Sequence, residues 1–140
     1  MLTQPHFSGN INMNTLIDKI QNNHIEEVRI IIREESIDVS DCGDKFLNEF
    51  ESSGVNFVSS AETITRQYRR ALARLAGCYR NSPEGKPMLI EGGVYQGCWL
   101  ESTGSINTEL LSRFSPALAE STFSVLADHT REDDLLLHRI

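Results

Sequence analysis

Apolar residues recur at helical spacing in the first third of the chain, but part of this stretch is also β-branched. From residue 15 onward they fall three to five positions apart, at Ile17, Ile20, Ile25, Val28 and Ile31. The run Val-Arg-Ile-Ile-Ile at 28–32 is also typical of a buried strand. We predict a helix that ends near His24, a strand over 28–32, and an acidic turn over 38–44.

Residues 59–79 carry the clearest helical pattern. Ser59 and Glu62 have the spacing of a capping box, in which each side chain binds the other residue's backbone N–H. Behind them the apolar residues step by three or four, at Ile64, Tyr68, Leu72, Leu75 and Tyr79. This pattern predicts a helix with one apolar stripe, which Gly77 and Pro83 stop.

The later pattern predicts a turn, a glycine-rich loop and two helices. The turn covers 83–87, the loop carries Tyr95 and Trp99, and a short helix follows over 108–114. Ser115 and Pro116 have the residue types of an N-cap and a first helical position. The apolar residues of the next helix are expected along one side, namely Leu118, Ala119, Phe123, Val125 and Leu126.

The whole pattern predicts a mainly α protein of about one domain, since its 140 residues lie within the roughly 100–200 residues of a single domain. We divide it into an N-terminal segment, 1–58, partly mobile, with a helix and a strand, and a helical part, 59–140. Residues 1–14 are polar and hold Pro5 and Gly9, which favours loose coil.

Charge and cysteine content narrow the classes of function. The net charge of −7 disfavours nucleic acid and anionic membrane surfaces as partners of the whole chain. Residues 61–80 carry five Arg and one Glu, and we expect these arginines to pair with acidic neighbours. Cys42, Cys78 and Cys98 are odd in number and far apart, so they indicate a reducing cytoplasm. No run approaches the length of a membrane helix.

Candidate chemistry concentrates around the only tryptophan. Neither Asp41 with Asp44 nor His129 with Asp133 offers a complete ligand set, so we predict no metal and no cofactor. Carboxylates near the glycine-rich loop and in the charged tail, with Trp99, have the composition of a carbohydrate site. An aromatic ring covers the apolar face of a sugar, and glycosidic cleavage needs two carboxyl groups.

Two segments add a family resemblance. Residues 85–101, Gly-Lys-Pro-Met-Leu-Ile-Glu-Gly-Gly-Val-Tyr-Gln-Gly-Cys-Trp-Leu-Glu, and 127–133, Ala-Asp-His-Thr-Arg-Glu-Asp, resemble bacterial six-hairpin glycosidases, the rhamnosidase-like and debranching-type hydrolases. The resemblance implies one or two hairpins of an (α/α)6 toroid, glycosidic bond hydrolysis, and carbohydrate as the substrate. It also implies the sugar contacts, at Trp99, Glu101, Arg131, Glu132 and Asp133.

The sequence departs from that family at Thr130, where Gln is usual, and at Asp134, where Gly permits a tight turn. The toroid needs a dozen helices, so we expect a fragment or truncated relative with impaired catalysis, whose general acid and base are unassigned. The competing interpretation is a small helical interaction module without catalysis, whose exposed apolar faces allow self-association.

Overall fold

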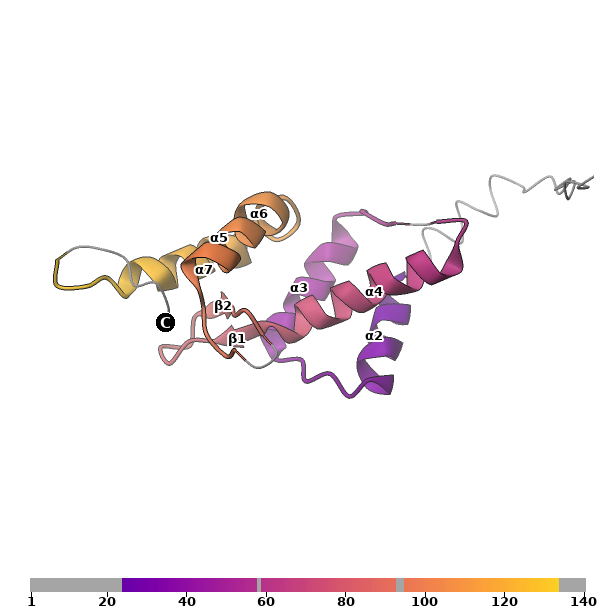
Figure 1. Cartoon of the computed structure of the whole chain (residues 1–140), viewed down its shortest axis with the longest axis horizontal. Helices are drawn as coiled ribbons and strands as arrows, with labels where there is room; N and C mark the ends of the chain where they lie inside the picture. The colour runs from indigo at the N-terminus through magenta and orange to yellow at the C-terminus, as the bar shows by residue number, and fades with distance from the viewer. Residues whose placement is uncertain (1–23, 58, 93–94, 134–140) are drawn as a thin grey trace, which may run out of the picture.

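The computed structural model describes residues 24–57, 59–92 and 95–133. The predicted helix before His24, the polar segment 1–14 and residues 134–140 lie outside these ranges. The described chain is mainly helical, as predicted (Figure 1). The helices and strands follow in this order: α2 His24–Glu34, α3 Asp41–Ser52, α4 Glu62–Gly77, β1 Tyr79–Asn81, β2 Pro87–Leu89, α5 Leu100–Ile106, η1 Asn107–Leu111, α6 Ser112–Phe114 and α7 Pro116–Asp128.

The predicted strand over 28–32 is wrong, because these residues form the middle of α2. Ile25, Val28 and Ile31 are buried, at the three-residue spacing of one helix face. That face packs against α4. Burial of a helical stripe outweighs the modest strand preference of β-branched residues.

The acidic turn predicted over 38–44 is wrong from Asp41 onward, where α3 begins. Ser40 caps this helix, since its hydroxyl accepts a hydrogen bond from the Gly43 N–H at 3.4 Å. Asp41 and Asp44 lie in the first turn, where carboxylates interact favourably with the helix dipole. The acidic residues therefore start a helix instead of making a turn.

The predicted helix over 59–79 is confirmed in its core, α4, and it stops at Gly77 as predicted. The capping box is wrong: Ala61 is the N-cap, and the Ser59 hydroxyl accepts the N–H of Ala61. The predicted stripe is confirmed except at its first residue: Leu72 and Tyr79 are buried, Tyr68 and Leu75 are partly buried against the core, and Ile64 is 53% exposed. The buried residues of α4 itself are Thr65, Leu72, Ala73 and Ala76.

Small residues extend the buried face of α4 toward α3. A Cβ atom on Gly43 of α3 would lie 2.3 Å from the carbonyl oxygen of Ala76, so the two helices cross in backbone contact. Only a face made of alanines allows α3 to approach so closely. A hydrophobicity pattern ranks Ile64 above Ala73, so it includes the exposed Ile64 and misses the buried Ala73.

An aromatic core joins the two halves of the chain. The Phe46 ring stacks on Tyr79 at 5.2 Å and lies 5.9 Å from Phe50, which meets Phe114 at 5.3 Å. Leu89 of β2 is buried in the same cluster. The helices α2–α4 and the elements that follow them therefore share one hydrophobic core.

The C-terminal half packs α7 against the hairpin β1–β2. Tyr79 pairs with Leu89 and Asn81 with Pro87 in antiparallel register. The Leu89 N–H donates to the Thr122 hydroxyl at 3.0 Å, and the Ser121 hydroxyl donates to the Pro87 carbonyl at 2.6 Å. Hydroxyl groups of α7 thus satisfy the outer edge of β2, which would otherwise hold unpaired backbone groups.

The two predicted C-terminal helices are confirmed with corrections. The helical stretch before Ser115 begins at Leu100 instead of residue 108, and it passes through the π-helical turn η1. Pro116 is the first residue of α7, but the Ser115 hydroxyl donates to Glu49 of α3 instead of capping the helix. Phe123 is 40% exposed and so does not share the buried side of α7.

Candidate functional site

A closed turn connects β2 to α5 and carries the predicted aromatic residues. We call it the aromatic turn, defined as Glu91, Gly92 and residues 95–99. The Glu91 N–H donates to the Gly97 carbonyl at 2.9 Å, and the Tyr95 N–H donates to the Gly92 carbonyl at 3.1 Å. These two hydrogen bonds fold the turn back on itself.

Gly92 has a structural role in this turn. Its φ is +83°, a conformation that favours glycine, and a Cβ atom here would lie 2.5 Å from the sulfur of Cys78. The turn therefore sits directly on the C-terminal end of α4. Any larger residue at position 92 would push the turn away from that support.

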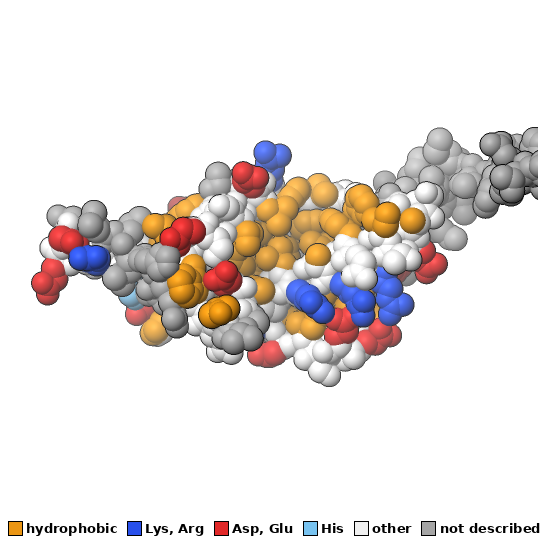
Figure 2. Space-filling model, in the orientation of Figure 1, with side chains coloured by type: hydrophobic (Ala, Val, Ile, Leu, Met, Phe, Trp, Pro, Cys, Tyr) orange, Lys and Arg blue, Asp and Glu red, His pale blue; other side chains and the backbone are white. Residues whose placement is uncertain are grey.

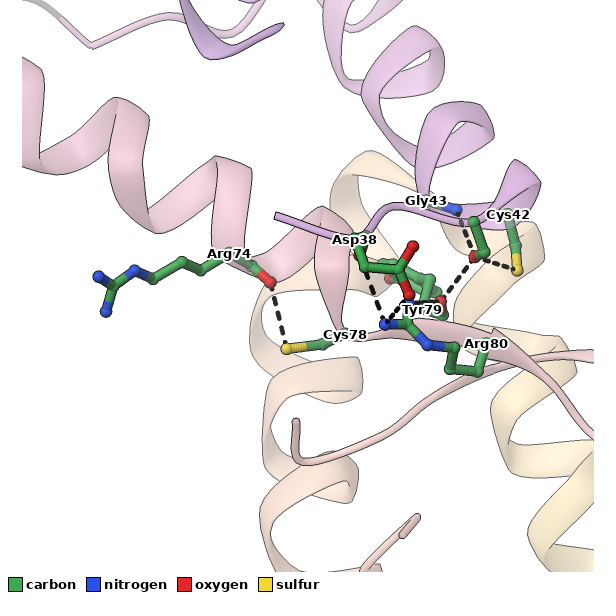
Figure 3. Close-up of polar contacts among 8 residues, drawn as sticks. Asp38, Cys42, Gly43, Arg74, Cys78, Tyr79 and Arg80 are labelled. Atoms are coloured by element: carbon green, nitrogen blue, oxygen red, sulfur yellow. Dashed lines mark hydrogen bonds and ion pairs between the residues drawn. The ribbon is translucent and has the colours of Figure 1, made fainter. Parts of the chain in front are cut away.

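Cys78 is a supporting residue and not an activated nucleophile. Its thiol donates to the Arg74 carbonyl at 3.2 Å, while the Arg74 guanidinium points away from the sulfur (Figure 3). Burial raises the pKa of the Cys78 thiol, and the charge of Arg80 only partly opposes this effect. A thiol with a raised pKa is mostly protonated near neutral pH and reacts slowly.

The aromatic turn presents an exposed pair of rings. Tyr95 and Trp99 meet edge to face, with ring centroids 6.4 Å apart and planes at 84°. The Tyr95 side chain is 63% exposed, and Trp99 is half-buried at the N-cap of α5. Glu91 and Glu101 are exposed at the two ends of the turn.

The Trp99 backbone is tied to the first turn of α5. The Thr103 N–H donates to the Trp99 carbonyl at 3.0 Å, and the Thr103 hydroxyl donates to the same oxygen. Glu101 lies between these two residues, in the first helical turn. The helix thus holds the indole and one predicted sugar-binding carboxylate on a rigid element.

The remaining predicted site residues follow α7. Arg131 and Asp133 form an ion pair at 3.0 Å, and Glu132 between them is exposed. The chain reverses after Ser115, so α7 runs back toward the side on which α5 begins (Figure 1). The predicted residues thus form two groups, one at the N-terminal end of α5 and one after α7.

A charged clasp fixes the C-terminal end of α7 to the tip of the β hairpin. Lys86 contacts Asp128 at 2.5 Å, and Glu84 lies 4.0 Å from Nε2 of His129. Nδ1 of the same imidazole is 2.8 Å from the Val125 carbonyl. The clasp anchors the turn that carries Arg131, and its long-range pairing has no signal in the local sequence.

Sequence reasoning also missed Tyr95 as a site residue. The loop's aromatic content was visible, but exposure of that ring and its contact with Trp99 depend on the closed turn. The available signal was a tyrosine that stands between glycines in a polar loop. Such an aromatic residue follows neither helical nor strand spacing, so the pattern gives no reason to expect it in the core.

The arginines of α4 are paired with acidic residues, as predicted. Figure 2 shows blue side chains beside red ones along this helix. Every partner lies on α2 or in the segment after it: Arg66 pairs with Glu34, Arg69 with Glu27, and Arg70 and Arg74 with Glu35. Arg80, which lies in β1, pairs with Asp38. Arg80 also donates to the Tyr79 carbonyl at 2.8 Å (Figure 3). These ion pairs therefore serve the packing of α4 on α2.

The acidic residues examined for metal binding have other roles. Asp44 pairs with Arg29 at 2.6 Å, and Asp133 with Arg131. In residues 24–57, 59–92 and 95–133, no group of three or more His, Cys, Asp or Glu side chains could hold a metal ion. Cys42, Cys78 and Cys98 are all free thiols.

Comparisons with known proteins give no independent assignment. No family model matches this chain, and neither a curated protein nor a solved structure matches it. In the described part of the chain, none of the helices combines the length and apolar character that a membrane span requires.

Proposed function

We propose that the aromatic turn is a carbohydrate-binding surface of a glycoside hydrolase-like helical protein. The observation that carries the proposal is the exposed Tyr95 ring set edge to face against Trp99. Covering an exposed aromatic ring with a ligand removes apolar surface from water, which favours binding. The ring is amphipathic, as is the sugar that would cover it.

The charges around the rings suit a polyhydroxylated ligand. Carboxylates accept hydrogen bonds from hydroxyl groups, and Glu91 and Glu101 are exposed at the two ends of the turn. Because the turn is closed by its own hydrogen bonds, little ordering entropy is lost on binding. Rings and carboxylates together favour a neutral sugar over an anionic ligand.

Arg131, Glu132 and Asp133 are the second element of the proposal. They come from the turn after α7, and the family resemblance implies that this run contacts the same sugar. The clasp of Lys86 with Asp128 keeps the beginning of this turn in place. The proposal gives these residues binding roles only, and it assigns neither the general acid nor the general base of glycoside hydrolysis.

Trp99 is the only tryptophan, so its fluorescence reports directly on the proposed site. We expect a saturable change in emission on titration with neutral monosaccharides and aryl glycosides. Tyr95→Ala should weaken the apparent affinity about tenfold, the equivalent of about 1.4 kcal/mol from one stacking ring. The matched control is Phe123→Ala, which removes another exposed ring from α7.

The proposal fails if no sugar in the panel changes the emission of a folded wild-type protein. It also fails if Tyr95→Ala and Phe123→Ala weaken binding equally, since the rings of the turn would then have no special role. A Glu101→Gln variant separates the carboxylate from the rings. It should retain stacking while losing a charged hydrogen-bond acceptor, and therefore lose less affinity than Tyr95→Ala.

A further inference from the structure

The connection between α3 and α4 places an aromatic ring on the surface of α4. Phe57 meets Tyr68 of this helix with ring centroids 5.0 Å apart. Ile64 precedes Tyr68 by one helical turn on the same side of α4. Ile64 is 53% exposed and Phe57 is 39% exposed. We call Phe57, Ile64 and Tyr68 the α4 patch, and Figure 2 shows hydrophobic side chains gathered over this connection.

The α4 patch is held in place by contacts on both of its sides. The Thr65 hydroxyl of α4 accepts the Ser59 N–H at 3.0 Å and donates to the Ser59 carbonyl at 3.4 Å. These bonds tie the connection to the helix two residues after Phe57. Tyr68 packs against the hydrophobic core from the other side. Large apolar side chains that meet on the surface in this way mark a binding surface.

The chain that precedes α2 joins the described structure beside this part of α4. His24, the first residue of α2, meets Phe50 of α3 edge to face, with ring centroids 5.9 Å apart. Burial, and next the charge of Arg69, lower the pKa of the His24 imidazole, so this ring lies near the Arg69 guanidinium. Arg69 directly follows Tyr68 in α4. The residues before His24 are therefore attached next to the α4 patch.

Apolar residues of that preceding segment lie within reach of the patch. Leu16, Ile17 and Ile20 stand four to eight residues before His24. An extended chain covers at most about 3.3–3.6 Å per residue, so four residues span about 13 Å and eight about 27 Å. Three large aliphatic side chains within five residues can cover two exposed apolar groups.

We propose that residues 16–20 of this chain dock on the α4 patch and cover Phe57 and Ile64. The attachment at His24 favours this occupant, because a tethered segment acts at an effective concentration in the millimolar range. A second copy of the chain suits the patch less well. Each copy carries a net charge of −7, so two copies repel one another.

Limited trypsin digestion tests the docking. Lys19 is the only Lys or Arg among residues 1–23, so the mass of the product identifies cleavage after it. Ile64→Asp should raise the rate of this cleavage about tenfold, because trypsin acts on the undocked segment. The matched control is Ile106→Asp, which puts the same charge on an exposed isoleucine of α5 and should keep the wild-type rate. Equal rates in Ile64→Asp and the wild type would overturn the proposal.

Methyl NMR on the full chain identifies the occupant. The δ1 methyl of Ile64 should give nuclear Overhauser contacts to methyl groups of Leu16, Ile17 or Ile20, and the δ1 methyl of Ile106 should give none of them. A lack of these contacts at Ile64 would overturn the proposal. Contacts at Ile64 that arise only between labelled and unlabelled chains in a mixed sample would also overturn it, in favour of self-association.

Discussion

Each half of the molecule is held together internally, and the kind of polar contact differs between the two halves. Between α2 and α4, long side chains bridge the helices through ion pairs, such as Arg69 with Glu27 and Arg70 with Glu35. Between α7 and β2, short hydroxyl groups of Ser121 and Thr122 bind the strand backbone directly. The ion pairs should weaken with added salt, whereas the neutral hydroxyl contacts should not. The ion pair of Lys86 with Asp128 adds one charged contact between the hairpin and α7.

The difference follows from what each helix meets. Helix α4 meets another helix, whose backbone groups are already bonded internally, so only side chains are available for polar contact. Helix α7 meets the edge of a two-stranded ribbon, whose backbone groups need partners. The proposed binding surface, the aromatic turn, lies in the half that contains these hydroxyl contacts.

The largest effect should come from the aromatic core that both halves share. Phe46→Ala removes a fully buried ring that contacts Tyr79 and Phe50, and should lower the free energy of unfolding by about 3–5 kcal/mol. Urea denaturation measures this loss of unfolding free energy. Phe57→Ala is the control, because that ring is partly exposed and should cost about 1 kcal/mol or less. Similar losses of unfolding free energy in Phe46→Ala and Phe57→Ala would show that the aromatic core does not unite the two halves.

Removal of the Thr122 hydroxyl should have the next largest effect. Thr122→Val keeps the shape of the side chain but leaves the Leu89 N–H without its partner, which should cost about 1–3 kcal/mol. Thr122→Ser retains the hydroxyl and should lose less. Urea denaturation at low and high salt should give the same loss for Thr122→Val. A strong salt dependence would contradict the neutral character of this contact.

The ion pair of Arg69 with Glu27 should contribute less. A double-mutant cycle of Arg69→Met and Glu27→Gln should give a coupling energy of about 0.5–1 kcal/mol at low salt, falling in about 1 M NaCl. Arg69 is 18% exposed, whereas Arg66 and Glu34 are 63% and 59% exposed at 3.8 Å, so their cycle should give a smaller coupling. Equal couplings, or values indifferent to salt, would contradict the comparison.

The smallest effect should be a pH dependence centred on His24. Burial, and next the charge of Arg69, lower the pKa of this imidazole, while Glu51 opposes them. The unfolded state then binds more protons than the folded state below about pH 6.5, so stability falls as the pH drops through that window. His24→Gln should remove this part of the pH profile. An unchanged slope in the variant would rule out His24 as its source.

The sequence predicted those features that depend on local spacing. The extent of α4 up to Gly77, the start of α7 at Pro116 and the pairing of the α4 arginines all followed from residue type and periodicity. The prediction failed where contacts between elements far apart in the chain decide the local structure. The β-branched run 28–32 is helical and packs on α4, and Ala76 of α4 is buried because Gly43 lets α3 approach its backbone.

The candidate site was predicted in composition but not in geometry. Trp99 and Glu101 are neighbours in sequence, and the first turn of α5 keeps them together. The exposure of Tyr95 depends on a turn closed between Glu91 and Gly97, and the clasp of Lys86 with Asp128 joins residues far apart in the chain. No local pattern encodes either contact.

The central claim is that the aromatic turn binds a sugar, and the indole N–H resonance of Trp99 tests it most directly. With one tryptophan in the chain, a proton–nitrogen correlation spectrum contains a single indole signal. We predict that a neutral sugar moves this signal saturably and that Tyr95→Ala weakens the response. An indole signal that stays fixed while the sugar moves backbone signals elsewhere would contradict the account.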